Sequence, residues 1–517
     1  MSSLRPSSTR ATPLSVVADV VGGELTLDGA GSEVLVRGVS LSSADVCGGD
    51  LYAALPGANA HGAAYAAAAA EAGAVAVLTD AVGAGILTEQ GVALPRILVE
   101  DPRSHVGAAA SLVYGTADLP LRLFGVTGTN GKTTTAYLVS SALTALGHVT
   151  GLIGTVETRI ADERVKSVRT TPEATVLHAL LAVMAERGVD SCVMEVSSHA
   201  LSQHRVDGVV YDVALFTNLS QDHLDFHHTM REYFLAKASL FTPERSRRGI
   251  VCVDDEWGRE LASVATVPVT TLTSRPDLEA DWRMLPGPEP ADLEITDGET
   301  SLSLRSALPG DFNRVNTAMA ALALLASGAP AHEAQSALLA DPHVPGRMER
   351  VVVEGCEALP LVVVDYAHTP EAVGAALKAL RPATDGALVV VLGAGGDRDR
   401  GKRAAMGRAA AQAADIVVVT DDNPRSEEPG AIRAAVLAGA REAGTAAELH
   451  DVQGRAEAIQ AGIRRAQTAG QGSVVAIVGK GHETGQEVAG TVYPFDDREE
   501  ARRALLALAG LPYGGAR

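Results

Sequence analysis

The stretch from Phe124 to Thr135 constrains the fold of this chain more than any other. It reads Phe-Gly-Val-Thr-Gly-Thr-Asn-Gly-Lys-Thr-Thr-Thr, follows the apolar run 121–124 and precedes a helical pattern that continues to about Leu146. We interpret it as a strand, a phosphate-binding loop and a helix. Its glycines allow backbone N–H groups to turn toward phosphate oxygens, its lysine adds a positive charge, and a neighbouring threonine hydroxyl can ligate Mg²⁺. The predicted nucleoside triphosphate site consists of Gly128, Thr129, Asn130, Gly131, Lys132, Thr133 and Thr134.

This loop departs from the strict pattern G-x-x-x-x-G-K-[ST] at one position. The pattern requires a glycine at 126, but Val126 stands there and the glycine comes one residue earlier. The shorter run Gly-Thr-Asn-Gly-Lys-Thr-Thr remains specific, because a glycine-rich turn without a ligand requires neither the lysine nor the threonine.

Length and charge limit the classes of protein that fit. A chain of 517 residues suggests roughly three domains. The net charge of −20 argues against a nucleic-acid partner or an anionic membrane, since no broad basic surface is available. No signal peptide and no apolar segment of about 20 residues is present, so we expect no membrane insertion. Four cysteines without a C-x-x-C pair indicate neither a zinc site nor disulfides, and fit a reducing cytoplasm.

The chain before the phosphate loop predicts a tail and a small domain. Residues 1–12 lack an apolar period and are expected to form a disordered tail. Residues 14–119 indicate a small α/β unit, with short β-like runs at 34–39, 51–54 and 75–78 and a helical stretch at 63–72. By itself this unit predicts no chemistry.

Two strands after the phosphate loop end in polar side chains. The predicted strand 191–196 ends at Glu195-Val-Ser-Ser-His199, and the predicted strand 212–217 is followed by a segment that includes His223. Each feature alone is more typical of a helix cap or a surface loop. Because the carboxyl ends of parallel strands meet at one edge of a sheet, we expect both to face the phosphate loop. Glu195 and His223 are therefore candidate Mg²⁺ ligands.

Lys237 allows two interpretations. The predicted helix 230–241 carries this lysine on one face with Phe234, Ala238 and Phe241. The pattern alone favours a lysine whose amine reaches solvent along an apolar surface. The alternative is a buried lysine of lowered pKa, whose neutral amine adds CO₂ and becomes a metal-binding carbamate.

The last part of the chain predicts a second site. Four apolar runs, 361–364, 388–392, 416–419 and 474–478, have the form of buried parallel strands, and each is followed at once by polar or glycine-rich residues. These ends are expected to share one rim. The run Gly393–Gly396 does not match G-x-G-x-x-G, so a nicotinamide site is not predicted.

Nearly the whole chain after the tail resembles the Mur ligases, the ATP-dependent amide-forming enzymes of bacterial cell-wall precursor synthesis. The matching residues are Gly-Thr-Asn-Gly-Lys-Thr-Thr at 128–134, Glu195 to His199, Asn218 to His223, Lys237, Asn313, Asn316, Gly346 to Glu349 and Asp365-Tyr-Ala-His-Thr-Pro370. The resemblance implies an α/β fold of three domains. These are a small N-terminal UDP-binding domain at 13–119, a central ATP-binding domain with a phosphate loop and parallel sheet at 120–345, and a C-terminal Rossmann-like domain at 346–517.

The resemblance also implies roles for individual residues. Lys132, Lys237, Glu195 and His223 would be catalytic, and Thr133, Glu195, His223 and a carbamylated Lys237 would hold Mg²⁺. ATP would also contact Asn313, Asn316, Arg347 and Asp365. The UDP end would contact Leu41, Ser43, Ala58, Asn59 and Ala60, although Leu-Ser-Ser-Ala stands at 41–44 where Leu-Asp-Ser-Arg is usual in the family. The muramoyl-dipeptide would contact Thr170, Thr171, Ser197, Gln203 and Arg205.

Within the family, Thr170-Thr171-Pro172, Gln203-His-Arg205 and Asp422-Asn-Pro-Arg425 are most similar to members that add meso-diaminopimelate. Its binding residues would be Arg398, Asp422, Asn423, Pro424, Arg425, Gly479 and Glu483. The implied reaction moves the γ-phosphoryl group of ATP onto the D-glutamate side-chain carboxylate of UDP-MurNAc-L-Ala-D-Glu. The diaminopimelate amine then attacks the acyl phosphate, while the domains of a monomeric enzyme close around both substrates.

Two other functions stay open at this point. A ligase that adds L-lysine, or glutamate as in folylpolyglutamate synthetase, would share the phosphate loop, and the run Asp422 to Arg425 argues against it. A switch or scaffold that hydrolyses ATP to change partner would also share it. A ligase is expected to turn over ATP only when both other substrates are present, whereas a switch requires neither.

Overall fold

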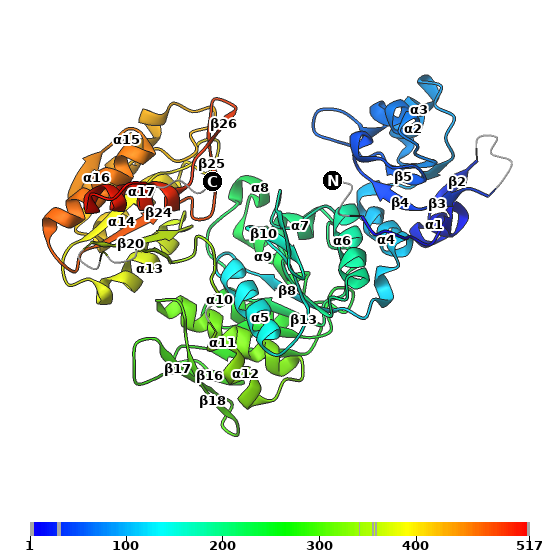
Figure 1. Ribbon diagram of the computed structural model, residues 1–517. Helices are drawn as coiled ribbons and strands as arrows, with labels where there is room; N and C mark the ends of the chain where they lie inside the picture. Colours follow the sequence, from blue (N-terminus) through cyan, green and yellow to red (C-terminus); the bar gives the residue numbers. More distant parts are fainter. Residues whose placement is uncertain (1–4, 28–32, 341, 354–355, 357–358, 514–517) are drawn as a thin grey trace.

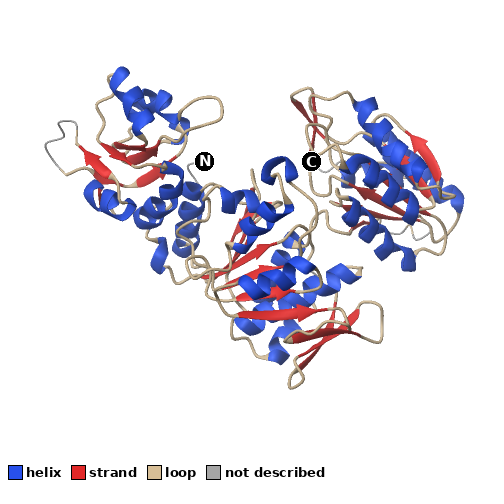
Figure 2. Cartoon of the chain, turned by 180° about the vertical axis from the view of Figure 1, so that it is seen from behind, coloured by secondary structure: helices blue, strands red, loops and turns tan. Residues whose placement is uncertain are grey.

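The computed structural model describes residues 5–27, 33–340, 342–353, 356 and 359–513. Figure 1 shows three bodies that follow one another along the chain, with the central one between the other two, and Figure 2 shows that each contains a sheet flanked by helices. In the described ranges, no helix combines the length and the apolar composition needed to cross a membrane.

The N-terminal domain is built on a five-stranded sheet of order β2-β7-β6-β5-β4, in which β4 to β7 run parallel and β2 runs antiparallel. Its elements are β1 (Thr12–Pro13), α1 (Leu14–Val21), β2 (Glu24–Thr26), β3 (Leu35–Val36), β4 (Gly38–Ser40), β5 (Asp50–Ala53), α2 (Ala66–Glu71), β6 (Ala76–Thr79), α3 (Ala81–Glu89), β7 (Arg96–Leu98) and α4 (Pro102–Tyr114). The predicted helix 63–72 is divided into a 3₁₀ turn at Gly62–Tyr65 and α2.

The described part of the segment that we expected to be a disordered tail contacts two domains. Arg5 pairs with Asp50 of β5 at 2.8 Å, and the backbone N–H groups of Ser7 and Ser8 donate to the carboxylate of Glu186 in the central domain. Composition did not predict these contacts, because ionic anchors depend on distant acidic residues rather than on an apolar period.

The central domain contains an eleven-stranded sheet of order β11-β10-β9-β12-β8-β13-β14-β15-β16-β17-β18. Its strands are β8 (Arg122–Thr127), β9 (Thr150–Ile153), β10 (Glu157–Ile160), β11 (Glu163–Lys166), β12 (Ser191–Glu195), β13 (Val213–Phe216), β14 (Gly249–Cys252), β15 (Val269–Thr273), β16 (Trp282–Pro286), β17 (Asp292–Thr296) and β18 (Ser301–Arg305). Its helices are α5 (Lys132–Ala145), α6 (Ala174–Glu186), α7 (Ser198–Ser202), α8 (Leu224–His227), α9 (Met230–Ala238), α10 (Glu256–Val264), α11 (Asp311–Ala326) and α12 (Ala331–Ala337).

Strand β8 lies in the middle of this sheet, parallel to β12 on one side and to β13 on the other. The strand is packed on both faces. Val126 belongs to the hydrophobic cluster that includes residues of α5 and α11, and the ring of Tyr211, in a second cluster, covers Gly125. A Cβ at position 125 would lie 2.9 Å from that ring, so the glycine permits the close packing. The strand therefore delivers the phosphate loop to the centre of the carboxyl edge.

The C-terminal domain contains a six-stranded sheet of order β19-β20-β24-β21-β22-β23, parallel from β20 to β23. Its strands are β19 (Glu349–Val351), β20 (Leu361–Asp365), β21 (Leu388–Leu392), β22 (Ile416–Val419), β23 (Glu448–Asp451) and β24 (Val474–Val478), with the hairpin β25 (Gly485–Val488) and β26 (Thr491–Pro494). Its helices are α13 (Pro370–Leu380), α14 (Lys402–Ala413), α15 (Pro429–Glu442), α16 (Arg455–Ala469) and α17 (Asp497–Ala509).

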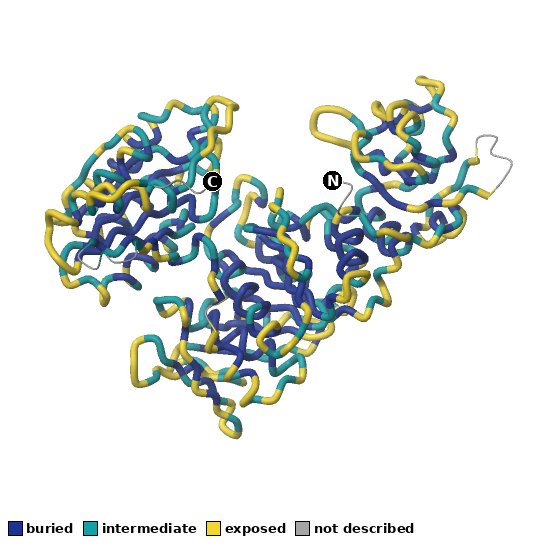
Figure 3. Tube along the Cα trace, viewed as in Figure 1, coloured by how far each residue is buried: buried dark blue, intermediate teal, exposed yellow. Residues whose placement is uncertain are grey.

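The four strands predicted here from apolar runs are adjacent in the sheet. Residues of α13, α14 and α15 cover one face and residues of α16 and α17 the other, so each strand is buried on both sides. Figure 3 shows this buried layer inside each body, with exposed residues concentrated at the outer loops. Burial on both faces explains why these runs are continuously apolar instead of alternating.

Candidate active site

The phosphate loop lies between the end of β8 and the start of α5. Gly131 has φ of 88° and precedes α5, where no side chain caps the helix. A Cβ at this position would lie 2.5 Å from Oδ1 of Asn316, so a larger residue would displace that amide as well as strain the backbone. The uncapped N–H groups of the first turn of α5 form a site suited to an anion.

A second segment holds the loop in place. Asn218 Oδ1 accepts a hydrogen bond from the Asn130 backbone N–H at 2.9 Å, and its Nδ2 donates to the Asn130 carbonyl at 3.1 Å. The side-chain oxygen of Thr129 lies 3.2 Å from the hydroxyl of Tyr233 on α9. The carboxyl ends of β8 and β13 are thus joined through the loop.

Two lysines point into this loop. Lys132 Nζ donates to the carbonyl oxygens of Gly128 and Thr129 at 3.0 and 2.9 Å, and Lys237 Nζ donates to the Gly128 carbonyl at 2.8 Å. Lys237 is 1% exposed and lies 4.8 Å from the centre of the Tyr233 ring. Burial and the charge of Lys132 hold the pKa of Lys237 well below its usual value. The interpretation that Lys237 reaches solvent is therefore wrong, and its amine is buried; the carbamate stays a prediction.

Glu195 ends β12 beside the loop. Its Oε2 accepts hydrogen bonds of 3.0 Å from the hydroxyls of Thr133 and Thr155, and its Oε1 accepts one of 2.8 Å from the Thr155 backbone N–H. The carboxylate of Glu195 and the hydroxyl of Thr133 therefore lie together at the edge of the phosphate loop. Sequence reasoning missed Thr155, which follows a glycine after β9 and belongs to no recognisable motif.

His223 lies in the segment that follows β13, directly before α8, in a left-handed conformation with φ of 54°. Its ring packs edge-on against the ring of His199, with centroids 4.8 Å apart. Burial lowers the pKa of His223 to about 3, so the imidazole is neutral near pH 7 and can act as a ligand. Next to it, Asp222 lies close to two side chains of the C-terminal domain: His368 Nε2 at 3.9 Å and Lys402 Nζ at 4.0 Å. Sequence reasoning missed this junction, because it joins segments about 150 residues or more apart.

The other predicted ATP-site residues lie either on α11, next to the loop, or in the C-terminal domain. Asn316 on α11 accepts from Thr135 Oγ1 at 3.3 Å and donates to Asn313 Oδ1 at 3.2 Å. Arg347 donates from Nη2 to Thr133 Oγ1 at 3.0 Å and lies over the ring of Tyr366. Asp365 ends β20 and accepts from the backbone N–H groups of Met348 and Ala367, and burial raises its pKa.

The residues predicted to contact the dipeptide form one network beside Glu195. Thr171 Oγ1 donates to the Glu195 carbonyl at 2.8 Å and accepts from the Ser197 N–H at 3.0 Å, and the hydroxyls of Thr170 and Thr155 lie 3.0 Å apart. Gln203 Oε1 accepts from Arg205 at 2.5 Å.

The residues predicted to contact UDP lie on a different sheet, that of the N-terminal domain. Leu41 and Ser43 follow β4, and the exposed residues Ala58, Asn59 and Ala60 follow the neighbouring parallel strand β5.

The predicted amino-acid residues meet at the carboxyl rim of the C-terminal sheet. Asn423 Nδ2 donates to Glu483 Oε2 at 2.9 Å, and a Cβ at Gly479 would lie 2.7 Å from Asp422 Oδ2. Arg425, which follows Pro424, has φ of 52°, donates to the Gly396 carbonyl at 2.7 Å and lies 3.3 Å from Glu487. The side chains of Arg425 and Arg398 both lie close to Gly395, so the two guanidinium-bearing chains flank the glycine-rich loop.

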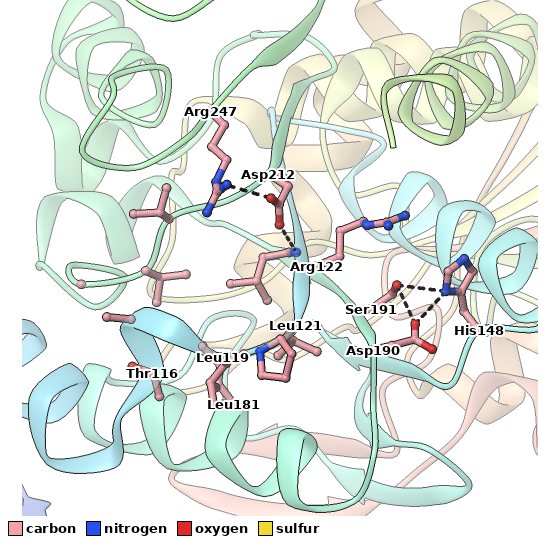
Figure 4. Close-up of a pocket in the computed structure, with 16 residues that line it drawn as sticks. Thr116, Leu119, Leu121, Arg122, His148, Leu181, Asp190, Ser191, Asp212 and Arg247 are labelled. Atoms are coloured by element: carbon pink, nitrogen blue, oxygen red, sulfur yellow. Dashed lines mark hydrogen bonds and ion pairs between the residues drawn. The ribbon is translucent and has the colours of Figure 1, made fainter. Parts of the chain in front are cut away.

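A cavity of about 550 Å³ lies at the opposite, amino-terminal edge of the central sheet (Figure 4). His148, Asp190 and Ser191 meet there, but not as a nucleophilic triad. The Ser191 hydroxyl donates to Asp190 at 2.8 Å, and the same Nδ1 of His148 faces both residues. A triad requires the serine and the carboxylate on different ring nitrogens. This cluster is therefore no hydrolase site.

Comparison with known proteins agrees with this geometry. Three family models match the chain: "Mur ligase family, catalytic domain" over residues 35–114, "Mur ligase middle domain" over 126–325, and "Mur ligase, glutamate ligase domain" over 346–481. The chain is 49% identical over 512 residues to the UDP-N-acetylmuramoyl-L-alanyl-D-glutamate–2,6-diaminopimelate ligase of Streptomyces avermitilis, covering 98% of this chain and 99% of that one. It is 47% identical to the UDP-N-acetylmuramyl-tripeptide synthetase of Leifsonia xyli, covering 98% of each.

A solved structure of a UDP-N-acetylmuramoyl-L-alanyl-D-glutamate–2,6-diaminopimelate ligase is also similar, with a TM-score of 0.63 and 32% identity over 92% of this chain and 96% of that one. The likeness therefore extends over all three domains and includes the phosphate loop and the C-terminal rim. This chain belongs to the Mur ligase family.

Proposed function

We propose that this chain adds meso-diaminopimelate to the D-glutamate side-chain carboxylate of UDP-MurNAc-L-Ala-D-Glu, with ATP as the source of energy. The observation that carries the proposal is the position of Arg347. This residue begins the C-terminal domain, and its guanidinium donates to Thr133 of the phosphate loop at 3.0 Å. A ligase must join a carboxylate activated at one site to an amine held at another, and such a contact supports coupled sites.

Activation of the carboxylate would take place at the phosphate loop. An oxygen of the substrate carboxylate attacks the γ-phosphorus of ATP, and the bond from that phosphorus to the oxygen that bridges it to the β-phosphate breaks. ADP departs, and the substrate carboxylate has become an acyl phosphate. Lys132 and the uncapped N–H groups of α5 would bind the phosphates and stabilise the charge that develops on them. Thr171, Ser197 and Arg205 would hold the dipeptide beside them.

The residues at the loop fit a magnesium ion. Thr133 Oγ1 and Glu195 Oε2 lie 3.0 Å apart, and His223 is neutral. The described residues contain no cluster of three or more His, Cys, Asp or Glu that could hold a metal alone, which suits an ion completed by phosphate oxygens. A carbamate on Lys237 would add an anionic ligand. When bound, Mg²⁺ neutralises charge on the phosphates.

The amine would be held by the C-terminal rim. The amine nitrogen attacks the acyl carbon, loses a proton and displaces inorganic phosphate, which completes the amide. Arg425 presents a planar donor fork that matches the distal carboxylate of diaminopimelate, and L-lysine lacks that group. The Streptomyces relative is named for the same amino acid, whereas the name of the Leifsonia relative leaves the amino acid open. The choice of amino acid therefore depends on the rim.

The test is an assay of purified protein with ATP, Mg²⁺ and UDP-MurNAc-L-Ala-D-Glu, with meso-diaminopimelate, L-lysine or L-glutamate as the amine. We expect the tripeptide product, measured by mass spectrometry, with meso-diaminopimelate, and ADP release only when both other substrates are present. The Lys132→Ala variant should form no product. ATP hydrolysis that ignores both substrates would favour a nucleotide-dependent switch, and preference for another amine would contradict the assignment of the rim. That the enzyme is a monomer and is located in the cytoplasm stays a prediction.

A further inference from the structure

Lys480 is a buried lysine at the rim of the C-terminal sheet, and the proposed chemistry does not use it. It directly follows Gly479, at the end of β24, and precedes Gly481, with both glycines in left-handed conformations, φ 117° and φ 54°. Its side chain is 0% exposed. A lysine between two glycines after a strand usually lies in solvent, so complete burial indicates that the ammonium has specific partners.

The partners of Lys480 are all residues of the proposed amino-acid site. Its Nζ donates to Asn423 Oδ1 at 3.0 Å and to Glu483 Oε2 at 3.1 Å, and it lies 3.8 Å from Asp422 Oδ1. Asn423 Nδ2 donates to the same Glu483 oxygen at 2.9 Å. Lysine, asparagine and glutamate therefore form a closed triangle of hydrogen bonds.

This triangle determines how the asparagine amide is oriented. Oδ1 of Asn423 accepts from two donors, Lys480 Nζ and the Glu487 backbone N–H at 3.0 Å, so it must be the amide oxygen. Nδ2 then points to Glu483 and fixes that carboxylate through Oε2, so that Oε1 is free of both donors. Without the ammonium, the Glu487 N–H would still orient the Asn423 amide, but Glu483 Oε2 would keep one of its two donors, Asn423 Nδ2, and would be held less firmly.

Lys480 also balances charge. Asp422 is buried, and the side chain of Glu483 is 33% exposed, so two carboxylates share a region with little solvent. The Lys480 ammonium contacts both carboxylates directly and, with the nearby buried guanidinium of Arg455, reduces their mutual repulsion. Removal of the ammonium would increase this repulsion and would take one of two hydrogen-bond donors from Glu483 Oε2.

We propose that Lys480 is a positioning residue for the amino-acid substrate, acting through Asn423 and Glu483. The inference rests on the proposed function and deepens it. Glu483 is held through Asn423, which stands two residues before Arg425 in the same segment of the rim. The opposite charges of Glu483 and Arg425 match a substrate end that bears both an ammonium and a carboxylate. Lys480 itself touches no reacting atom.

The test compares Michaelis constants in the full-length enzyme. In Lys480→Met, which keeps the length of the side chain without its charge, KM for meso-diaminopimelate should rise roughly 10- to 100-fold. KM for ATP and KM for UDP-MurNAc-L-Ala-D-Glu should stay within about twofold. The matched control is Lys378→Met, the same exchange at an exposed lysine of α13, which should change none of the three constants.

A double variant separates positioning from general packing. If Lys480 acts through Glu483, the effect on KM of Lys480→Met should largely disappear in a Glu483→Gln background, so the two effects do not multiply. Equal losses in all three constants, an unchanged KM for the amino acid, or multiplicative effects would overturn the inference. If Lys480→Met does not fold, Lys480→Arg decides by the same criteria, because it retains the charge but not the geometry of the triangle.

The outcome stays distinct from a failure of the proposed function. A parent enzyme that uses another amine contradicts the choice of diaminopimelate, yet the same comparison of constants with that amine still tests Lys480.

Discussion

Arg347 and Thr133 meet across the boundary between the C-terminal and central domains, with Nη2 of the arginine 3.0 Å from Oγ1 of the threonine. The same hydroxyl donates to Glu195 Oε2 at 3.0 Å. One residue of the phosphate loop thus links the arginine of one domain to the carboxylate of the other. This chain of contacts connects the position of the C-terminal domain to the nucleotide site.

The first prediction concerns this contact. Arg347→Ala should lower kcat by a factor on the order of 10²–10³, because it removes a preorganised cation from the phosphoryl-transfer site. Arg347→Lys should recover part of the loss, since it restores the charge but not the planar fork. Steady-state kinetics measure both. Arg350→Ala, at an exposed arginine of β19, is the control. Normal turnover by Arg347→Ala would contradict the coupling of the two domains.

The second prediction concerns Lys237. Lys237→Ala should be inactive, and a small carboxylate such as acetate should restore part of the activity by replacing the carbamate. Because burial lowers the pKa of Lys237, its amine is neutral at a pH at which an ordinary lysine is protonated, and only the neutral amine adds CO₂. The bicarbonate-dependent part of the parent activity should therefore be lost as pH falls.

The measurement for Lys237 is the rate with and without bicarbonate across pH, in the parent and in Lys237→Ala. Lys378→Ala serves as the control for loss of a lysine. A fully active Lys237→Ala enzyme would refute the carbamate, as would catalysis with a free Lys237 ammonium in an experimental structure.

The third prediction concerns stability. His178 on α6 is fully buried, with Nδ1 2.6 Å from Thr116 Oγ1 and Nε2 3.0 Å from the Asp207 carbonyl oxygen. Burial lowers its pKa to about 4. Between this value and the ordinary pKa of about 6.5, the unfolded state binds more protons than the folded state, so stability rises with pH across this interval. The stabilisation of the native state that is lost between pH 7 and pH 4 is about 3 kcal/mol.

Thermal unfolding at several pH values tests this. The parent melting temperature should fall more steeply below pH 6.5 than that of His178→Gln, once each is compared with its value at pH 7. His332→Gln, at an exposed histidine, should follow the parent. Parallel curves for the parent and His178→Gln would show that His178 does not titrate as predicted.

Much of the fold could be predicted because strands buried on both faces leave a strong pattern. The runs at 388–392 and 416–419 are uninterrupted leucine, valine and isoleucine, and they are observed as β21 and β22. The shared rim could be predicted from position, because polar or glycine-rich residues follow each such run, whereas the roles of its individual residues were implied only by the resemblance to the family. The meeting of Glu195 and the phosphate loop could likewise be predicted from their positions at strand ends.

The rest depends on contacts that sequence does not display. Lys480 stands between glycines, as a solvent-exposed loop lysine often does, and only the fold brings Asn423 to it from 57 positions away. The one available signal was its place at a strand end in a Gly-Lys-Gly run, which resembles the placement of Lys132. Burial of Lys237 could not be decided from periodicity, because a lysine on an apolar face is compatible with both snorkelling and burial.

The last prediction concerns Arg425, which we expect to discriminate meso-diaminopimelate from L-lysine. The two amino acids differ at the distal carbon, where diaminopimelate carries an additional carboxylate. A guanidinium can bind this group with two parallel hydrogen bonds, and the fixed φ of Pro424 stiffens the turn that carries it. The Arg425 backbone is itself held against the hairpin, since its N–H donates to the Glu487 carbonyl at 3.1 Å and its carbonyl accepts from Ala489 at 2.7 Å.

Bound lysine would lack the carboxylate that we expect Arg425 to bind, and loss of this charge-assisted contact costs roughly 2–5 kcal/mol, equivalent to tens- to thousands-fold in selectivity. The ratio of kcat/KM for diaminopimelate over lysine should therefore fall sharply in Arg425→Ala. Some discrimination should remain, because Arg398 flanks the same glycine-rich loop. Arg408→Ala is the matched control, since Arg408 pairs with Glu442 on the surface between α14 and α15 and should leave the ratio unchanged. An unchanged ratio in Arg425→Ala, or a parent enzyme that prefers lysine, would refute the assignment, because the distal carboxylate would then be recognised elsewhere or not at all.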